Sequence, residues 1–219
     1  AEPFQWIKAR WRCEAFHYPD VDEVLREVRI AGKAVRDVVP RWRKLNLLFT
    51  DVRVPHDYQR DALSAWQLFG QRGSIVLPTG ADKTYVAIHA ILRVDRSTLV
   101  VAPTIDLLHQ WYARLTNAFA QTPPTYTSDG EEAPFQIGVY YGREKNIQPI
   151  TVTTYHSAGD LIEAAGNQFK LIIYDEVHHL PAPNWGETAL MAPAPFRLGL
   201  TATYPDPGDA HRRPFAHQR

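Results

Sequence analysis

The sequence has very little cysteine and no excess charge of either sign, and both scarcities narrow what the chain can be. Its 219 residues include a single cysteine, Cys13, so no disulfide can form within the chain, and we expect a reducing compartment. Lysine plus arginine and aspartate plus glutamate each number 24. This balance excludes a uniformly basic nucleic-acid binder, because any grip on nucleic acid must come from a local patch.

Long apolar runs and low-complexity tracts are also missing. No run approaches the roughly 18 residues that a membrane span requires, and the first residues, AEPFQWIKARWR, lack the apolar middle of a signal peptide. We therefore expect no membrane partner. At 45% hydrophobic and 22% charged residues, the chain can bury a sizeable core. Its length predicts one domain with a small appendage.

The first 50 residues differ in character from the rest. They hold ten basic and seven acidic residues, and several of the basic ones lie near tryptophans. Their apolar spacing predicts a short strand near 10–16, a helix over about 21–31 and a strand at 34–38. We interpret the basic residues as a solvated helix face, with DNA contact as the less favoured alternative. We expect this small α+β extension to cover residues 1–51.

From residue 52 the pattern alternates between strands and helices. We predict helices at 56–69, 83–93, 105–119, 156–165 and 184–191, and strands at 74–77, 98–102, 135–140, 150–153, 170–174 and 196–200. A loop is expected at 121–134. Strands this apolar, separated by helices, indicate the α/β class, with a mostly parallel sheet covered by helices on both faces.

The first segment that carries chemistry is residues 77–84, LPTGADKT. It follows a predicted strand and opens a helix, which is the context that a phosphate-binding loop needs. Lys83 would reach the β- and γ-phosphates of a nucleotide, and the Thr84 hydroxyl would bind Mg²⁺. Taken alone, the segment fits an ordinary Pro-Thr-Gly turn before a helix equally well.

Asp82 is the main departure from the pattern G-x-x-x-x-G-K-[ST], which has glycine at this position. Its carboxylate would approach the phosphate oxygens. Two like charges about 4 Å apart repel by about 1 kcal/mol in water and about 4 kcal/mol at an effective dielectric of 20. Leu77, in place of the first glycine, is a milder departure, because Gly80 can still make the turn.

A second segment, LIIYDEVHH at 171–179, is an apolar strand that ends in Asp175 and Glu176. At the carboxyl edge of a parallel sheet, one carboxylate can hold Mg²⁺ while the next activates a water. The alternatives are a plain charged strand end, or a zinc site of His156, His178 and His179, which no ligand spacing supports. A third segment, LGLTAT at 198–203, is another strand that ends in small hydroxyl residues.

Together these segments resemble a superfamily 2 helicase or translocase. PTGADKT resembles the family's motif I, VVAPTIDLLHQW motif Ia, TTYHS the motif Ib/Ic region, DEVHHL motif II and LGLTAT motif III. DYQRDAL at 57–63 resembles the element ahead of motif I. The motif sequences are similar to those of the XPB branch, and the run from Phe4 to Val21 resembles the end of that branch's damage-recognition domain.

The resemblance implies a RecA-like P-loop NTPase lobe over residues 52–219, with ATP and Mg²⁺ as cofactors and a DNA-associated location in the cytoplasm, nucleoid or nucleus. Lys83, Asp175 and Glu176 would be catalytic, with Asp175 and Thr84 at the metal. The remaining implied roles are nucleotide binding by Gln59, Thr79 and Gly80, coupling to DNA by His178, Thr201 and Thr203, and DNA-backbone contact by Pro103, Thr104, Thr153 and Thr154.

The family also implies a partner, a second RecA-like lobe in cis or trans that carries the arginine finger. Such a finger contributes about 10³–10⁵ in rate in related chemistry, so one lobe alone is expected to be nearly inert as an ATPase. The Arg-Glu-Asp element that usually follows motif III in the XPB branch is replaced by residues 205–209, PDPGD.

Three readings of the function follow. The favoured one is the N-terminal lobe of an XPB-like, ATP-dependent DNA helicase or translocase. The second is a degenerate, non-catalytic binding module, favoured by Asp82 and opposed by the intact Lys83, Thr84, Asp175 and Glu176. The third is the motor lobe of a restriction or other nuclease system, with a nuclease or repair partner. A small P-loop kinase has no need of the DEVH and TAT segments in this order.

Overall fold

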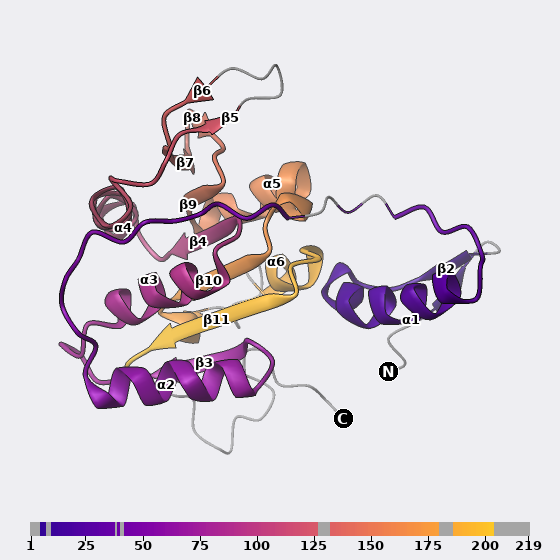
Figure 1. Cartoon of the computed structure of the whole chain (residues 1–219), viewed down its shortest axis with the longest axis horizontal. Coiled ribbons are helices and arrows are strands. Elements are labelled where there is room, and N and C mark those ends of the chain that lie inside the picture. Colours follow the sequence, from indigo (N-terminus) through magenta and orange to yellow (C-terminus); the bar gives the residue numbers. More distant parts are fainter. Residues whose placement is uncertain are drawn as a thin grey trace.

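The structure is a computed structural model of the chain, and it describes residues 5–7, 10–37, 39, 42–126, 132–179 and 186–203. A seven-stranded sheet forms its centre (Figure 1). The strands are β3 (Arg72–Val76), β4 (Thr98–Ala102), β7 (Ile137–Tyr141), β8 (Glu144–Asn146), β9 (Ile150–Thr154), β10 (Leu171–Asp175) and β11 (Phe196–Thr201).

The strands lie in the order β3-β11-β10-β4-β9-β7-β8, and each neighbouring pair is parallel except β7 with β8. The predicted α/β class and mostly parallel sheet are confirmed. The chain passes from β3 to β4 and leaves a space that β10 and β11 later fill. The segments that follow β3, β10 and β11 therefore emerge side by side at the carboxyl edge, where open α/β sheets bind ligands.

Helices cover both faces, as the alternation of the strands requires. One face carries α2 (Asp57–Leu68), α3 (Lys83–Val94) and α4 (Ile105–Ala118), and the other carries α5 (Tyr155–Ala165) and α6 (Gly186–Met191). Val100 and Ile173 are buried with the first group of helices, whereas their chain neighbours Leu99 and Ile172 are buried with the second. Successive side chains point to opposite faces, so these strands are apolar throughout.

Side-chain caps start the helices at the carboxyl edge. The Thr104 hydroxyl accepts a hydrogen bond from the Leu107 amide at the start of α4, and Thr154 accepts one from the Ser157 amide at the start of α5. Asp82 accepts from the Tyr85 amide at the start of α3. The caps of α4 and α5 use amides that the first turn would otherwise leave unpaired, whereas the Tyr85 amide also donates to the Asp82 carbonyl at 3.0 Å.

The region before α2 holds the short antiparallel strands β1 (Gln5–Ile7) and β2 (Arg10–Arg12), the turn η1 (Ala15–His17) and the helix α1 (Tyr18–Ile30). The strand expected over 10–16 stops at residue 12, because the chain turns into η1 and a helix that has proline in its first turn. No strand forms in the described residues 34–37. The guanidinium groups of Arg72 and Arg197 both pack against the aromatic ring of Phe16, 4.3 and 4.6 Å from its centre.

Residues 42–53, which we call the strap, cross the outer surface of α3 and α4 before α2 begins (Figure 1). Backbone amides of the strap bond to loops and helix ends beneath it: Leu45 to the Asp95 carbonyl at 3.2 Å and Thr50 to the Ala118 carbonyl at 3.0 Å. Leu47 is buried in the core. The strap is therefore attached to the helices that it crosses, while the predicted boundary after residue 51 stays a prediction.

One further strand pairing was not expected. β5 (Thr125–Tyr126) and β6 (Glu132–Ala133) form a two-residue antiparallel pair inside the predicted loop at 121–134. The remaining elements are the turns η2 (Gly166–Gln168) and η3 (Val177–His179).

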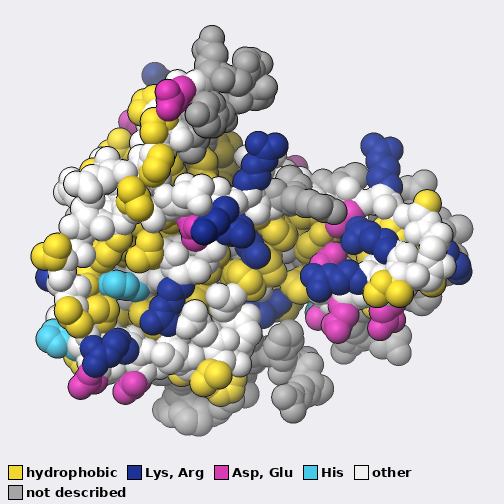
Figure 2. All heavy atoms as spheres, in the orientation of Figure 1, with side chains coloured by type: hydrophobic (Ala, Val, Ile, Leu, Met, Phe, Trp, Pro, Cys, Tyr) yellow, Lys and Arg dark blue, Asp and Glu magenta, His cyan; other side chains and the backbone are white. Residues whose placement is uncertain are grey.

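On the face drawn in Figure 2, basic and acidic side chains are interspersed. Among the described residues, no helix is both long and apolar enough to cross a bilayer.

Candidate active site

The loop at residues 77–82 joins β3 to α3, which confirms the predicted strand–turn–helix context. The Leu77 amide donates to the Thr201 carbonyl at 3.1 Å, so the start of the loop is fixed to the end of β11. Gly80 has φ +85°, and the space where a Cβ would stand is open to 4 Å. Thr79 and Gly80 are exposed. The loop thus presents open backbone at the carboxyl edge of the sheet.

Lys83 and Glu176 face each other across this edge. Lys83 is the first residue of α3, and its Nζ lies 3.9 Å from Oε1 of Glu176, which follows β10 directly. The lysine side chain is 13% exposed and that of Glu176 is 29% exposed. Glu176 has φ +48°, a left-handed conformation that turns the chain immediately after the strand. A cation and a carboxylate from different elements therefore meet beside the 77–82 loop.

Asp175 is buried at the end of β10 and is held by two hydrogen bonds. The indole Nε1 of Trp111 donates to its Oδ2 at 2.8 Å, and the Glu176 amide donates to its Oδ1 at 3.1 Å. Burial raises the pKa of Asp175 above its ordinary value, although the hydrogen bond from Trp111 lowers it. The hydroxyl of Tyr155 donates to the Asp175 carbonyl at 3.0 Å. The carboxylate is thus fixed in orientation from the α4 side.

A short polar chain leads from Glu176 to the end of β11. Nδ1 of His178 lies 3.5 Å from Oε2 of Glu176 and 3.0 Å from the Thr201 hydroxyl. That hydroxyl donates to the Thr203 carbonyl at 2.8 Å, and the Thr203 amide donates back to it at 3.2 Å. The three residues predicted to couple the nucleotide to DNA therefore form one connected group with Glu176.

Gln59 lies at the start of α2 with both ends of its side-chain amide engaged. Oε1 accepts from the His56 amide and Nε2 donates to the Ala81 carbonyl, each at 3.0 Å. The side chain is buried. Its amide therefore ties the start of α2 to the 77–82 loop.

The four residues predicted to contact DNA lie at the ends of β4 and β9, and Ala102 is in register with Thr154. Thr104 is exposed and Pro103 is half-buried. Thr153 and Thr154 are buried, and the Thr153 hydroxyl donates to the Tyr140 carbonyl at 2.7 Å. Burial leaves Pro103 and Thr104 as the accessible side chains of the predicted group.

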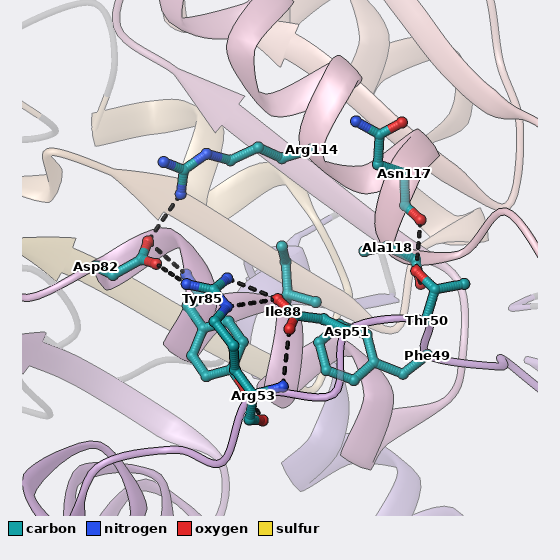
Figure 3. Close-up of a pocket in the computed structure, with 10 residues that line it drawn as sticks. All are labelled: Phe49, Thr50, Asp51, Arg53, Asp82, Tyr85, Ile88, Arg114, Asn117 and Ala118. Atoms are coloured by element: carbon teal, nitrogen blue, oxygen red, sulfur yellow. Dashed lines mark hydrogen bonds and ion pairs between the residues drawn. The ribbon is translucent and has the colours of Figure 1, made fainter.

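Asp82 lines a cavity of about 320 Å³ together with residues of α3, α4 and the strap (Figure 3). Its Oδ1 lies 2.8 Å from Nη1 of Arg114, and its Oδ2 lies 3.3 Å from Nη1 of Arg53. Desolvation opposes its ionisation, but the hydrogen bonds and charges of Arg114, followed by the Tyr85 amide and Arg53, hold the pKa of Asp82 below its ordinary value.

Three of these partners were absent from the sequence prediction. Trp111 lies in the predicted helix at 105–119, and no hydrogen bond of its side chain was predicted, although a buried indole N–H needs an acceptor and so indicates one nearby. Arg53 and Arg114 carried no signal, since neither belongs to a motif. The residues at 205–209, in place of an Arg-Glu-Asp element, lie outside the described residues.

Residues 53–206 match the protein-family model described as "Type III restriction enzyme, res subunit". The chain belongs to this family. Within the res-subunit family match lie the 77–82 loop, Lys83, Asp175, Glu176 and the end of β11.

Curated relatives of this res-subunit family chain carry XPB names. A DNA 3'-5' translocase XPB2 of Sulfurisphaera tokodaii is 40% identical over 190 residues, which are 86% of this chain and 39% of that protein. A DNA 3'-5' helicase XPB of Mycobacterium tuberculosis is 36% identical over 155 residues, or 67% of this chain and 26% of that one. The chain thus spans well under half the length of these relatives. Its resemblance to the XPB branch is confirmed.

Solved structures agree on the fold. The UvsW helicase from bacteriophage T4 superposes with a TM-score of 0.55 at 18% identity, covering 94% of this chain and 76% of that one. A Sulfolobus solfataricus SWI2/SNF2 ATPase core, solved with double-stranded DNA, gives 0.55 at 17% identity, covering 79% and 36%. The res-subunit family chain therefore has the RecA-like helicase fold, while the roles of its individual residues stay predictions.

Proposed function

We propose that this chain is the N-terminal ATP-binding lobe of an XPB-like, ATP-dependent DNA helicase or translocase, and that a second RecA-like lobe completes its active site. The observation that carries the proposal is the meeting of Lys83, Glu176 and the buried Asp175 beside the 77–82 loop. Similarity to XPB relatives over most of the chain supports the choice of DNA as the partner.

The residues at this edge fit a nucleotide with Mg²⁺. Open backbone at Gly80, the amino end of α3 and the Lys83 ammonium provide the positive potential that phosphates require. Lys83 pairs with Glu176 at 3.9 Å, and we expect it to turn toward the β- and γ-phosphates when they arrive. Bound there, ATP·Mg²⁺ would supply the phosphoryl group whose hydrolysis drives movement.

Within this proposal, Asp175 and Thr84 hold Mg²⁺ and Glu176 orients the attacking water. The hydrogen bond from Trp111 fixes the Asp175 carboxylate, as groups behind a metal ligand commonly do. His178 and Thr201 then link Glu176 to the end of β11, so that a change in the nucleotide's phosphates would be transmitted through Glu176 to that strand. Contacts to the DNA backbone by Pro103 and Thr104 position a strand without reading its sequence.

The test is equilibrium binding of a fluorescent ATP analogue in the presence of Mg²⁺. We expect measurable affinity in the wild type and a large loss in Lys83→Ala, because the lysine makes charged contacts with two phosphates. The matched control is Lys145→Ala, which removes a lysine from the exposed edge strand β8. Equal binding by the wild type and Lys83→Ala would contradict the proposal.

Hydrolysis tests the need for a second lobe. We expect negligible steady-state ATPase from this chain alone, and stimulation when a lobe carrying the arginine finger is supplied with DNA. A turnover on the order of tens per second from the isolated chain, within the range of complete phosphoryl-transfer enzymes, would show that no second lobe is needed.

The family description favours one further candidate, a motor lobe in a restriction or nuclease system. Duplex DNA incubated with the full-length protein, Mg²⁺ and ATP separates the two. Cleavage products would favour the nuclease system, whereas strand movement without cleavage would favour the XPB-like motor. A third outcome, tight DNA or protein binding with no nucleotide affinity, would indicate a degenerate binding module.

A further inference from the structure

Asp82 occupies a backbone position suited to glycine. Its φ and ψ are 48° and 58°, in the left-handed region, and it immediately precedes Lys83. Among residues with a side chain, aspartate and asparagine tolerate this conformation best, because their short polar groups can bond locally. Asp82 does so, since its Oδ1 accepts from the Tyr85 amide at 3.3 Å. A local hydrogen bond thus supports the left-handed backbone conformation of Asp82.

The negative charge of the Asp82 carboxylate would still repel phosphates, and two arginines neutralise it. Arg114 reaches Oδ1 of Asp82 from α4 at 2.8 Å, and Arg53 reaches Oδ2 from the end of the strap at 3.3 Å (Figure 3). Both approach from the cavity side, whereas Lys83 is engaged with Glu176 at the sheet edge. The Asp82 carboxylate and the Lys83 ammonium are therefore held by different partners, the carboxylate by the two arginines that line the cavity.

The two arginines are not equivalent. Arg53 is itself held by Asp51, with Nη2 2.6 Å from Oδ2, and its guanidinium lies 4.4 Å from the centre of the Tyr85 ring. Its charge is shared between two carboxylates. Arg114 makes the shorter contact with Asp82, 2.8 Å against 3.3 Å for Arg53. Arg114 is thus the stronger partner.

We propose that Arg114, assisted by Arg53, is a positioning residue that keeps the Asp82 carboxylate out of the phosphate loop and cancels its charge, so that nucleotide binds beside an aspartate. The inference rests on the proposed function, because it concerns the same nucleotide site. It makes Asp82 a compensated substitution rather than a sign of lost binding. The physical effect is the removal of a like-charge repulsion between the carboxylate and the phosphates.

A double-mutant cycle tests this inference. The affinity for a fluorescent ATP analogue with Mg²⁺ is measured in the wild type, Arg114→Gln, Asp82→Gly and the double variant. We expect Arg114→Gln to weaken binding about tenfold, because a freed carboxylate would face the phosphates. The same change should have no effect when Asp82→Gly is also present, since no charge then needs to be held.

Controls separate positioning from a structural role. Arg93→Gln removes one positive charge from the far end of α3, and it should leave the affinity unchanged. Adenosine, which lacks phosphates, should bind the wild type and Arg114→Gln equally. Asp82→Asn should rescue Arg114→Gln, because it removes the charge and keeps a side-chain acceptor for the Tyr85 amide. Thermal unfolding of each variant reports whether the fold is retained.

The outcomes for the two proposals are distinguishable. The inference would be overturned if Arg114→Gln lowered the nucleotide affinity equally with and without Asp82→Gly, or if Arg114→Gln alone did not lower it. Either result would leave the proposed nucleotide site intact. Failure of all four proteins to bind nucleotide, Asp82→Gly included, would overturn the proposed function, and this inference with it.

Discussion

Replacement of Trp111 by phenylalanine should destabilise the protein more than the same replacement at Trp66. Both indoles are buried, and both donate one hydrogen bond, Trp111 to Oδ2 of Asp175 at 2.8 Å and Trp66 to the Arg197 carbonyl at 2.9 Å. Each change leaves a similar cavity. The difference between them therefore isolates the acceptor, which is a carboxylate in one case and a neutral carbonyl in the other.

The magnitude follows from the hydrogen bonds. A bond to a charged group contributes about 1.5–3 kcal/mol, whereas one between neutral groups contributes about 0.5–1.5 kcal/mol. We expect Trp111→Phe to lower the free energy of unfolding at pH 7 by about 1 kcal/mol more than Trp66→Phe does. Urea denaturation followed by far-UV circular dichroism measures this, because tryptophan fluorescence would itself change with each substitution.

The extra destabilisation caused by Trp111→Phe should also depend on pH, in a direction set by the pKa of Asp175. Burial raises the pKa of Asp175 above its unfolded value, so its ionised form subtracts stability at pH values above both. Loss of the Trp111 bond, which lowers that pKa, should raise it further. The excess cost of Trp111→Phe should therefore shrink as the pH falls through the raised pKa of Asp175, and it should be smallest well below about 3.9, the ordinary pKa of aspartate, where the carboxyl is protonated in both the folded and the unfolded state. Equal costs at pH 7, or an excess that does not change with pH, would refute the reasoning.

Three other predictions concern residues around the site. Gly199→Ala should lower the free energy of unfolding by about 1–3 kcal/mol in the same urea assay, because the new Cβ would lie 2.9 Å from Cγ1 of Val177; unchanged stability would contradict the close packing of β11 against η3. Gln59→Ala should cost about 1–3 kcal/mol in thermal or urea unfolding, because it removes the bonds of the side-chain amide to the Ala81 carbonyl and the His56 amide, and the carbonyl keeps only the longer 3.4 Å bond from the Tyr58 hydroxyl; Gln67→Ala, on the exposed side of the same helix, should cost little. Burial lowers the pKa of His89, so the wild type should lose stability as the pH falls below about 6.5; His89→Phe should flatten that part of the profile, and identical profiles for the two proteins from pH 5 to 7 would count against it.

The alternation of strands and helices could be predicted because the central strands are apolar on both faces. β4 and β10 are buried along their whole length, and such runs stand out in the sequence. β8 was missed for the opposite reason. Its residues, Glu144, Lys145 and Asn146, are exposed and pair antiparallel at the edge of the sheet, where no apolar pattern is required.

The candidate site likewise contains residues that local sequence predicts and contacts that depend on residues far apart in the chain. The meeting of Lys83, Asp175 and Glu176 could be predicted because each lies at or after the end of a parallel strand, and the carboxyl ends of parallel strands share one edge. The partners of Asp82 could not be predicted, since Arg53 and Arg114 lie 29 and 32 residues away in the chain and are brought to it only by the packing of the strap and α4. The local sequence shows that Asp82 stands where the phosphate-loop pattern has glycine. Only the fold shows that Arg53 and Arg114 contact its carboxylate.

The strap also determines how the molecule would respond to mechanical load. Its amides bond in succession to groups beneath it, from Leu45 with Asp95, through Leu48 with Thr122, to Thr50 with Ala118. A force applied to the region before it would therefore meet these bonds one after another, as in a zipper, while the parallel strands of the sheet would share a load along their axis all at once. Tension on that region would peel the strap first, and the last contacts to be reached are those of Arg53 with Asp82.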